Sequence, residues 1–304
     1  MRAVFVDASE TLAAVARRLL RPDDPPFAIH AEPAITPQDL PGLLAGAEIA
    51  VIDHTALPRD VARACVGLKH VVFLGTGARS YMDPEALQAE LGVTVHTIKG
   101  YGDTAVAECA FALMWAAARG LAEMDRAMRA GSWLRTEGMQ LTGKCVGLIG
   151  FGGIAAEMAR LCAGIGMRVL AWNRTPRTHP DVAFVPLEQL LAESDVVSLH
   201  LLLTDETRGF LSADRIAALK PGAILINTAR GAVTDEDALV EALRTGHIAQ
   251  AGLDVFTVEP LPADHPLAGL PNVTLSAHSA FRTPEASANL IGAALDHCRR
   301  IAAG

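Results

Sequence analysis

Three polar residues in the C-terminal half, Arg230, Glu259 and His278, have side chains that together suit proton transfer at a carbonyl group. They follow three short apolar runs that we predict to be strands, Ala223–Asn227, Gly252–Val255 and Val273–Ser276. Ligands of open α/β sheets bind beyond the carboxyl ends of the strands, so we expect all three residues in one crevice. A hydride delivered to a ketone creates an alkoxide, which one cation can stabilise and one acid can protonate. Each residue alone would more often serve packing or the surface, but the set predicts a reacting site.

A glycine-rich turn, Gly150-Phe151-Gly152-Gly153-Ile154-Ala155, precedes these residues in the chain and has the form GxGxxA. It follows the predicted strand Val146–Ile149 and opens the predicted helix Ile154–Ile165, as a dinucleotide fingerprint requires. Gly150 permits the tight turn, Gly152 lets the backbone approach a pyrophosphate, and Ala155 allows close helix–strand packing. The helix N-terminus adds free N–H groups and a partial positive charge. The sequence therefore predicts a bound nicotinamide dinucleotide.

The end of the next predicted strand, Val169–Trp172, indicates which dinucleotide is preferred. A carboxylate there would bind the ribose hydroxyls of NAD, but Asn173, Arg174 and Thr175 stand in its place. These side chains can donate to a 2′-phosphate, whereas a carboxylate would repel it. We therefore favour NADP, with NAD or dual use as the alternative. In the opposite interpretation, Arg174 and Arg177 are surface charges only.

Short apolar runs alternate with helical patterns along almost the whole chain, which favours parallel sheets covered on both faces. The first series of predicted strands is Ala3–Val6, Ile49–Asp53, Val71–Leu74 and Val93–Thr97. A long helix is predicted from about Thr104 to Ala122, and a second, complete doubly wound unit follows it. We expect the last helix, Pro284 to Ala302, to fold back on the first domain. The fold class is thus α/β with two doubly wound parallel-sheet domains.

Composition limits the classes of partner. The chain has 304 residues, of which 51% are hydrophobic and 20% charged, so it can bury a large core. Its formal net charge of -8 argues against nucleic acid, whose phosphates need a basic face. No HExxH motif or Cys/His cluster indicates a metal site, and no apolar stretch is long enough to cross a membrane. With five cysteines and no signal peptide, we predict a cytoplasmic protein with reduced thiols.

Taken in order, these segments resemble the D-isomer-specific 2-hydroxyacid dehydrogenase family, in particular its glyoxylate and hydroxypyruvate reductases. The similarity covers nearly the whole chain. It rests on Gly100–Asp103 with Val106–Glu108, Gly150–Ala155, Asp195–Leu201, Lys220–Ala223, Asn227–Gly231, Asp254–Phe256 with Glu259–Pro262, and Ser276–Ala280.

The resemblance implies a role for each domain. Residues 1–98 and 281–304 would form a flavodoxin-like substrate domain, and residues 99–280 a Rossmann domain that binds NAD(P). The chain would then be an oxidoreductase that transfers a hydride between NAD(P)H, with NADPH favoured, and a small 2-oxo acid to give a D-2-hydroxy acid. The alternative is a dinucleotide-sensing, corepressor-like binding protein. Family members are usually homodimers joined through their cofactor domains, and the segment Gly131–Gly143 with Trp133 is a candidate for that interface.

The resemblance also implies residue roles. Arg230 would hold the substrate carboxylate and polarise the 2-oxo group, and His278 would be the general acid. Glu259 would orient His278 and keep it protonated near neutral pH, while Asp254 would lie beside the nicotinamide carboxamide. The substrate contacts would be Gly75, Thr76, Gly77, Arg230 and His278. The cofactor contacts would be Gly150, Gly152, Gly153, Ile154, Asn173, Arg174, Thr175, Leu201, Thr207, Thr228, Ala229, Asp254 and Val106.

Three features depart from the family pattern. Ala277 stands where a proline often precedes the histidine, and Leu202 replaces a frequent proline after His200-Leu201. The segment Ala78–Asp83 differs from the commoner Asp-Asn pattern near the substrate loop. The last departure bears on substrate identity, and the sequence does not specify which 2-oxo acid is used.

Overall fold

The chain divides into two units, each built around its own parallel sheet. The computed structural model describes residues 1–32 and 34–304. Residues Met1–Gly102 together with Arg282–Gly304 form the first unit, and Asp103–Phe281 form the second. The α/β fold class predicted from the sequence is therefore confirmed.

The sheet of the first unit has the strand order β2-β1-β3-β4-β5, with every neighbouring pair parallel, which is the flavodoxin-like order. Its strands are β1 (Ala3–Phe5), β2 (Phe27–Ile29), β3 (Ile49–Ile52), β4 (His70–Phe73) and β5 (Thr94–Thr97). The helices of this unit are α1 (Glu10–Leu19), α2 (Leu40–Leu43), α3 (Arg59–Ala64), α4 (Pro84–Leu91) and α12 (Pro284–Ala303), with short 3-10 turns at Pro37–Asp39 and Ala78–Ser80.

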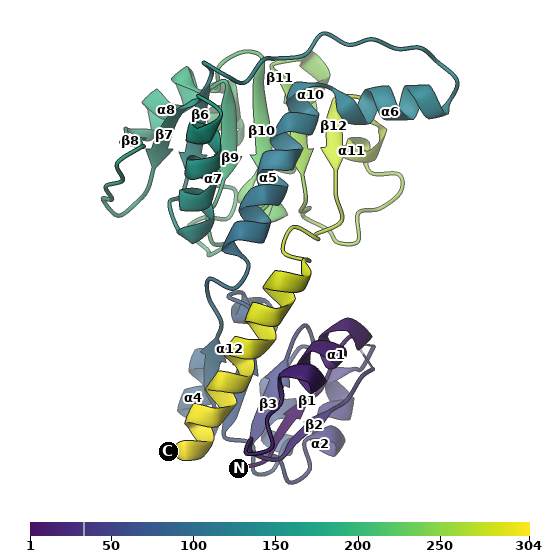
Figure 1. Ribbon diagram of the computed structural model, residues 1–304, viewed down its shortest axis with the longest axis vertical. Coiled ribbons are helices and arrows are strands. Elements are labelled where there is room, and N and C mark those ends of the chain that lie inside the picture. Colours follow the sequence, from purple (N-terminus) through teal and green to yellow (C-terminus); the bar gives the residue numbers. More distant parts are fainter. Residues whose placement is uncertain (33) are drawn as a thin grey trace. The chain divides into compact units, whose positions relative to one another are not determined.

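The alternating direction of successive side chains along the strands explains why helices cover both faces of this sheet. Ala3, Phe5 and Val72 pack on one side with α1 and α12, while Val4, Val71 and Phe73 belong to the opposite core with α2, α3 and α4. Successive side chains of a strand point to opposite faces, so strands that are apolar throughout need helices on both. The last helix of the chain thus packs on the first unit (Figure 1).

The second unit contains a seven-stranded parallel sheet in the order β12-β11-β10-β9-β6-β7-β8. Its strands are β6 (Cys145–Ile149), β7 (Arg168–Trp172), β8 (Ala183–Phe184), β9 (Val196–Leu199), β10 (Ala223–Asn227), β11 (Ile248–Leu253) and β12 (Val273–Leu275). Its helices are α5 (Asp103–Ala118), α6 (Leu121–Arg129), α7 (Gly153–Gly164), α8 (Leu187–Glu193), α9 (Ala213–Ala217), α10 (Glu236–Thr245) and α11 (Pro266–Gly269), with a 3-10 turn at Gly231–Val233.

The strand order reverses between β6 and β9, which is the topological switch point of a Rossmann sheet. Helices α5 and α7 pack on one face and α8 and α10 on the other. Dinucleotides bind at the carboxyl edge of such a sheet beside the switch point. The turn that follows β6 lies at that edge.

One predicted helix is wrong in its extent. The helix expected from Thr104 to Ala122 ends at Ala118, and a separate helix, α6, begins at Leu121. Gly120 lies between them with φ +60°, a left-handed backbone that glycine adopts without steric cost. A Cβ at this position would also lie 2.9 Å from Thr136 Oγ1. The two helices are bent by 66° at this break (Figure 1).

No single helix in residues 1–32 and 34–304 is long and apolar enough to cross a membrane. Helices α5 and α6 reach the necessary length and composition only when they are taken together. Seven residues of α5 are buried in the second unit, among them Leu113 and Met114. Its apolar character is therefore explained by the core of this unit.

Candidate active site

The glycine turn after β6 has the backbone that a dinucleotide site needs. Gly150 adopts φ +87°, and a Cβ on it would lie 2.7 Å from the carbonyl oxygen of His200. Only glycine therefore fits at the tight turn. Gly152 is the N-cap of α7, and a Cβ on it would meet nothing within 4 Å. Ala155 is fully buried against the sheet, so the helix and the strand approach closely.

Buried polar atoms near the carboxyl ends of β9 and β10 support the same location. Among the described residues, His200 Nε2 and Thr228 Oγ1 are buried and have no hydrogen-bond partner. Burial lowers the pKa of His200 to about 4, so its ring is neutral at physiological pH. Buried polar atoms are normally satisfied, and such orphans mark places where a polar ligand group can bind. A nicotinamide dinucleotide fits this edge.

Two residues expected at the ribose, Asn173 and Arg174, have hydrogen-bond or ion-pair partners within the protein. Asn173 Oδ1 accepts a hydrogen bond from Phe151 N at 3.0 Å, and Asn173 Nδ2 donates to the carbonyl oxygen of Thr175 at 2.7 Å. Asn173 thus ties the end of β7 to the glycine turn. Arg174 forms an exposed ion pair with Glu206.

Other residues expected at the cofactor lie on the same unit. Ile154 is in the first turn of α7, Val106 is on α5, and Leu201 follows β9. Thr207 Oγ1 donates to the carbonyl oxygen of Leu202 at 2.6 Å. In addition, Ala229 N donates to Asn227 Oδ1 at 2.9 Å, which fixes the turn after β10.

The imidazole and carboxylate expected to act together are hydrogen-bonded. His278 Nδ1 lies 2.6 Å from Glu259 Oε2, with the two side chains 40% and 33% exposed. The second carboxylate oxygen, Oε1, accepts a hydrogen bond from Phe256 N at 2.9 Å, so both oxygens of Glu259 are engaged and the carboxylate is fixed. This arrangement leaves the other imidazole nitrogen, Nε2, as the atom available for proton transfer to a ligand.

His278 has an uncommon backbone conformation, with φ +47°. A non-glycine residue in this region is strained and persists only where the surroundings hold it. The surroundings here centre on Asp254, which is fully buried. Its carboxylate accepts from Ser276 Oγ at 2.5 Å and from the N–H groups of Ser279 and Ala280 at 3.0 Å each, and its carbonyl oxygen accepts from His278 N at 2.8 Å.

Asp254 therefore fixes the loop that carries the histidine. The family resemblance implies a place for Asp254 beside the nicotinamide carboxamide, and that contact stays a prediction. The role of Ser276 as a partner of the buried carboxylate was not predicted.

Arg230 follows β10, and its guanidinium has no acidic partner among residues 1–32 and 34–304. Its Nη1 donates to the carbonyl oxygen of Ala229 at 2.7 Å, and its own carbonyl oxygen accepts from Asn227 Nδ2 at 3.0 Å. The remaining N–H groups suit an anionic ligand, because a guanidinium presents a planar, permanently charged fork.

Gly231 brings the arginine loop against the loop that carries Glu259. A Cβ on Gly231 would lie 2.0 Å from the carbonyl carbon of Phe256 and 2.3 Å from Thr257 N. No other residue fits without moving one of these loops. The sequence contained a signal for this contact, namely a glycine directly after a strand-end arginine, but the spacing alone did not identify the partner.

The predicted substrate loop of the first unit follows β4. Gly75 has φ +146°, and its carbonyl oxygen accepts from Ile98 N at 3.0 Å. The N–H groups of Thr76 and Gly77 donate to no atom of the described residues, so they are available to an anion. Arg79, a possible additional cation, forms an ion pair with Glu85.

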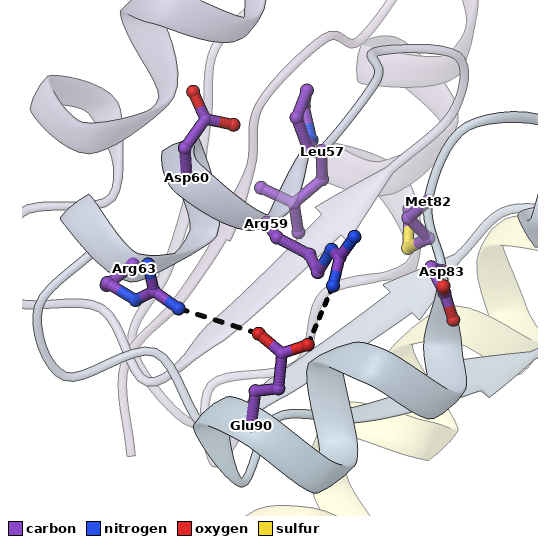
Figure 2. A pocket seen from close by; sticks show the side chains of 8 residues that line it. Leu57, Arg59, Asp60, Arg63, Met82, Asp83 and Glu90 are labelled. Carbon is purple, nitrogen blue, oxygen red and sulfur yellow. Dashed lines mark hydrogen bonds and ion pairs between the residues drawn. The ribbon is translucent and has the colours of Figure 1, made fainter.

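A hollow between α3 and α4 is a poor candidate for an acidic substrate. Figure 2 shows Arg59 and Arg63 both directed to Glu90, with ion pairs of 2.7 and 3.5 Å. Asp60 and Asp83 also line the hollow, so acidic residues outnumber basic ones there. The charge balance thus disfavours a carboxylate ligand.

In the described part of the chain, a Rossmann sheet with this glycine turn carries a paired histidine and glutamate and an arginine without an acidic partner at adjacent strand ends. These features are typical of a dinucleotide-dependent dehydrogenase. Comparison with known proteins agrees. A family model described as "D-isomer specific 2-hydroxyacid dehydrogenase, NAD binding domain" matches residues 111–280. The chain belongs to this family, whose members are NAD(P)-dependent 2-hydroxyacid dehydrogenases.

Individual relatives are named as enzymes. The glyoxylate reductase of Korarchaeum cryptofilum is 43% identical over 204 residues, which cover 64% of this chain and 61% of that protein. The glycerate dehydrogenase of Methylorubrum extorquens is 34% identical over 280 residues, covering 88% of this chain and 87% of that one. A solved acyclic imino acid reductase in complex with NADPH and D-Arg has a TM-score of 0.82 at 27% identity, covering 96% and 94% of the two chains. These names do not favour the alternative of a corepressor-like binding protein.

The buried carboxylate of Asp254 can be tested by the substitution Asp254→Asn. An amide cannot accept from all three donors, and its own N–H group would face a backbone N–H, so we expect a loss of about 2 kcal/mol in the free energy of unfolding. We also expect loss of the low-field proton signal of the His278–Glu259 hydrogen bond in NMR spectra. The control Asp205→Asn changes an exposed acid and should alter neither. An unchanged imidazole signal in Asp254→Asn would show that this carboxylate does not position the histidine.

Proposed function

We propose that the protein is an NADPH-preferring reductase of small 2-oxo acids that produces a D-2-hydroxy acid. The observation that carries this proposal is the hydrogen-bonded pair of His278 and Glu259 at strand ends near Arg230, which has no acidic partner among the described residues. The names of the relatives, glyoxylate reductase and glycerate dehydrogenase, support a substrate with a short side group.

Each residue has one task in the proposed reaction. Bound NADPH supplies the hydride, which is chemistry that belongs to the cofactor. Arg230 binds the substrate carboxylate and stabilises the negative charge that develops on the 2-oxo oxygen. His278 donates the proton from Nε2 to that oxygen, and in the reverse direction Nε2 accepts it. Glu259 holds Nδ1 and keeps the ring oriented. Taken by itself, the loop after β4 in the first unit is a proposed anion site, because the N–H groups of Thr76 and Gly77 donate to no atom of the described residues.

The proposed preference for NADPH rests on the end of β7. Asn173 replaces the carboxylate that would repel a 2′-phosphate, and Arg174 is exposed beside it. The ion pair of Arg174 with Glu206 is exposed on both sides, at 76% and 73%, and such pairs contribute only about 0–1 kcal/mol. A phosphate can therefore take the place of Glu206 at little cost. The bound NADPH of the related imino acid reductase is consistent with this proposal.

We also propose a homodimer formed through the second unit. The segment Gly131–Gly143 that follows α6, called the arm below, has Trp133 exposed by 77% and Leu134 by 37%. Helix α6 itself exposes Leu121 and Met128. Large apolar side chains grouped on one segment are typical of protein interfaces. The arm runs along the outside of the unit (Figure 1). The cytoplasmic location remains a prediction from the sequence.

Removal of the proposed acid or cation should strongly reduce turnover without unfolding the protein. We expect His278→Ala to lower kcat by about 10³-fold and Arg230→Ala to lower kcat/KM by a similar factor. The measurement is oxidation of NADPH, followed by its absorbance, with a panel of 2-oxo acids that includes glyoxylate and hydroxypyruvate. Arg244→Ala, an exposed arginine on α10, is the control. Full activity in both site variants would refute the mechanism.

The cofactor preference should change with one exposed arginine. We expect Arg174→Ala to lower kcat/KM for NADPH about tenfold and to leave the value for NADH unchanged, because only NADPH carries the 2′-phosphate. Arg168→Ala, at the opposite end of β7, should change neither. An equal loss with both cofactors would exclude Arg174 as a 2′-phosphate ligand.

The proposed interface can be tested by sedimentation. We expect the protein to sediment as two chains of 32.0 kDa each, and Trp133→Asp to shift it toward one chain, because a charge at the centre of an apolar contact opposes association. Val66→Asp alters a residue of the first unit that is 83% exposed and should leave the mass unchanged. A Trp133→Asp protein that remains dimeric would place the interface elsewhere.

A further inference from the structure

The carboxylate of Asp103, the first residue of α5, lies against the first turn of α7. A Cβ added to Gly153 would come within 1.8 Å of Asp103 Oδ2 and 2.8 Å of its Cγ. At Gly152, one residue earlier, such an atom would meet nothing within 4 Å. A side chain is therefore excluded at Gly153 by a protein atom, whereas at Gly152 no protein atom excludes it. Gly152 leaves open space for a ligand, whereas Gly153 makes room for the carboxylate of Asp103.

The charges around this carboxylate do not neutralise it. In the part of the chain that the structure describes, Asp103 forms no ion pair and no hydrogen bond through its side chain. The charged residue of α7 that acts on it is another acid, Glu157, which is itself paired with Arg160 at 3.0 Å. Burial, and in second place the charge of Glu157, raise the pKa of Asp103 above its ordinary value.

The same helix end is the proposed site of the cofactor's pyrophosphate, and the following inference rests on that proposal. We propose that Asp103 couples dinucleotide binding to the uptake of one proton at its carboxyl group. An anionic pyrophosphate and an ionised carboxylate at one helix terminus repel each other, and a proton from solvent on Asp103 removes that repulsion. Asp103 thereby sets the affinity for the cofactor and makes it depend on pH.

The sign of the effect follows from the order of the two pKa values. Binding raises the pKa of Asp103 further, so the complex holds more protons than the free protein wherever the pH lies between the two values. Affinity therefore increases as the pH falls through this window and becomes constant once Asp103 is protonated in both states. Above the window the carboxylate stays charged, and binding is weakest there.

The test is isothermal titration calorimetry of the whole protein with ADP-ribose between pH 5.5 and 8. ADP-ribose carries the pyrophosphate but lacks the nicotinamide, so it does not occupy the proposed reacting end at His278. We expect wild-type affinity to fall several-fold as the pH rises, with proton uptake visible as a heat that differs between two buffers of unlike ionisation enthalpy. Asp103→Asn should bind about tenfold more tightly at pH 7.5, with no dependence on pH and no proton uptake.

Two controls separate this effect from a general change of charge. Glu108→Gln removes an exposed acid from the same helix and should keep the wild-type pH dependence and proton uptake. Glu157→Gln should tighten binding slightly and keep the proton uptake, because Asp103 is still present. Circular dichroism and thermal unfolding confirm that each variant is folded.

The outcomes distinguish this inference from the proposed function. If the wild-type protein binds ADP-ribose without proton uptake, or if Asp103→Asn binds as the wild type does at every pH, the role of Asp103 is refuted and dinucleotide binding stands. If the wild-type protein binds neither ADP-ribose nor NADPH nor NADH, the proposed function itself is wrong.

Discussion

The arrangement of the reacting residues depends on one buried carboxylate, that of Asp254. A carboxylate without exposure to water is costly unless hydrogen bonds compensate it, and here three donors from residues 276–280 do so. Those donors belong to the loop that holds His278 at φ +47°, a conformation that the residue would not adopt unaided. The buried carboxylate and the strained histidine loop therefore stabilise each other. If the loop moved, the carboxylate would lose its hydrogen-bond donors, and without the carboxylate the loop would lose the acceptor that holds it.

The same constraint extends sideways across the sheet. β10, β11 and β12 are parallel neighbours, so the loops that follow them begin at one edge. Backbone hydrogen bonds from Asp254 N to Asn227 O and from Ser276 N to Leu253 O continue the pairing of the strands into the loops that follow them. Contact of Gly231 with the backbone at Phe256 then joins the arginine loop to the glutamate loop. The loops that carry Arg230, Glu259 and His278 are thus held together by contacts between backbone atoms.

Sequence reasoning succeeded where the determinants are local. The glycine turn follows a strand and opens a helix, and apolar runs of four or five residues located most strands, because burial on both faces leaves a continuous signal. It failed at the break between α5 and α6, since the apolar pattern continues past Gly120 and the side chain that excludes a Cβ there, Thr136, is remote in the sequence. The three-residue strand β2 also escaped, because so short a run has no periodicity. Partners such as Ser276 with Asp254, or Asp103 with Gly153, lie 22 and 50 residues apart, and a single sequence has no signal for such pairs.

The two ends of the proposed dinucleotide site differ in how many loops each involves. At the reacting end, Asp254 is buried and the His278–Glu259 pair is hydrogen-bonded to fixed backbone, so a change there disturbs several loops at once. At the ribose end, Arg174 and its partner Glu206 are exposed, and exposed ion pairs add little to stability. A substitution at Arg174 can therefore alter which phosphate pattern is preferred while the free energy of unfolding stays nearly constant. By this reasoning the proposed cofactor preference is the more adjustable property, whereas the position of His278 is fixed by the hydrogen bonds that also join the loops at the sheet edge.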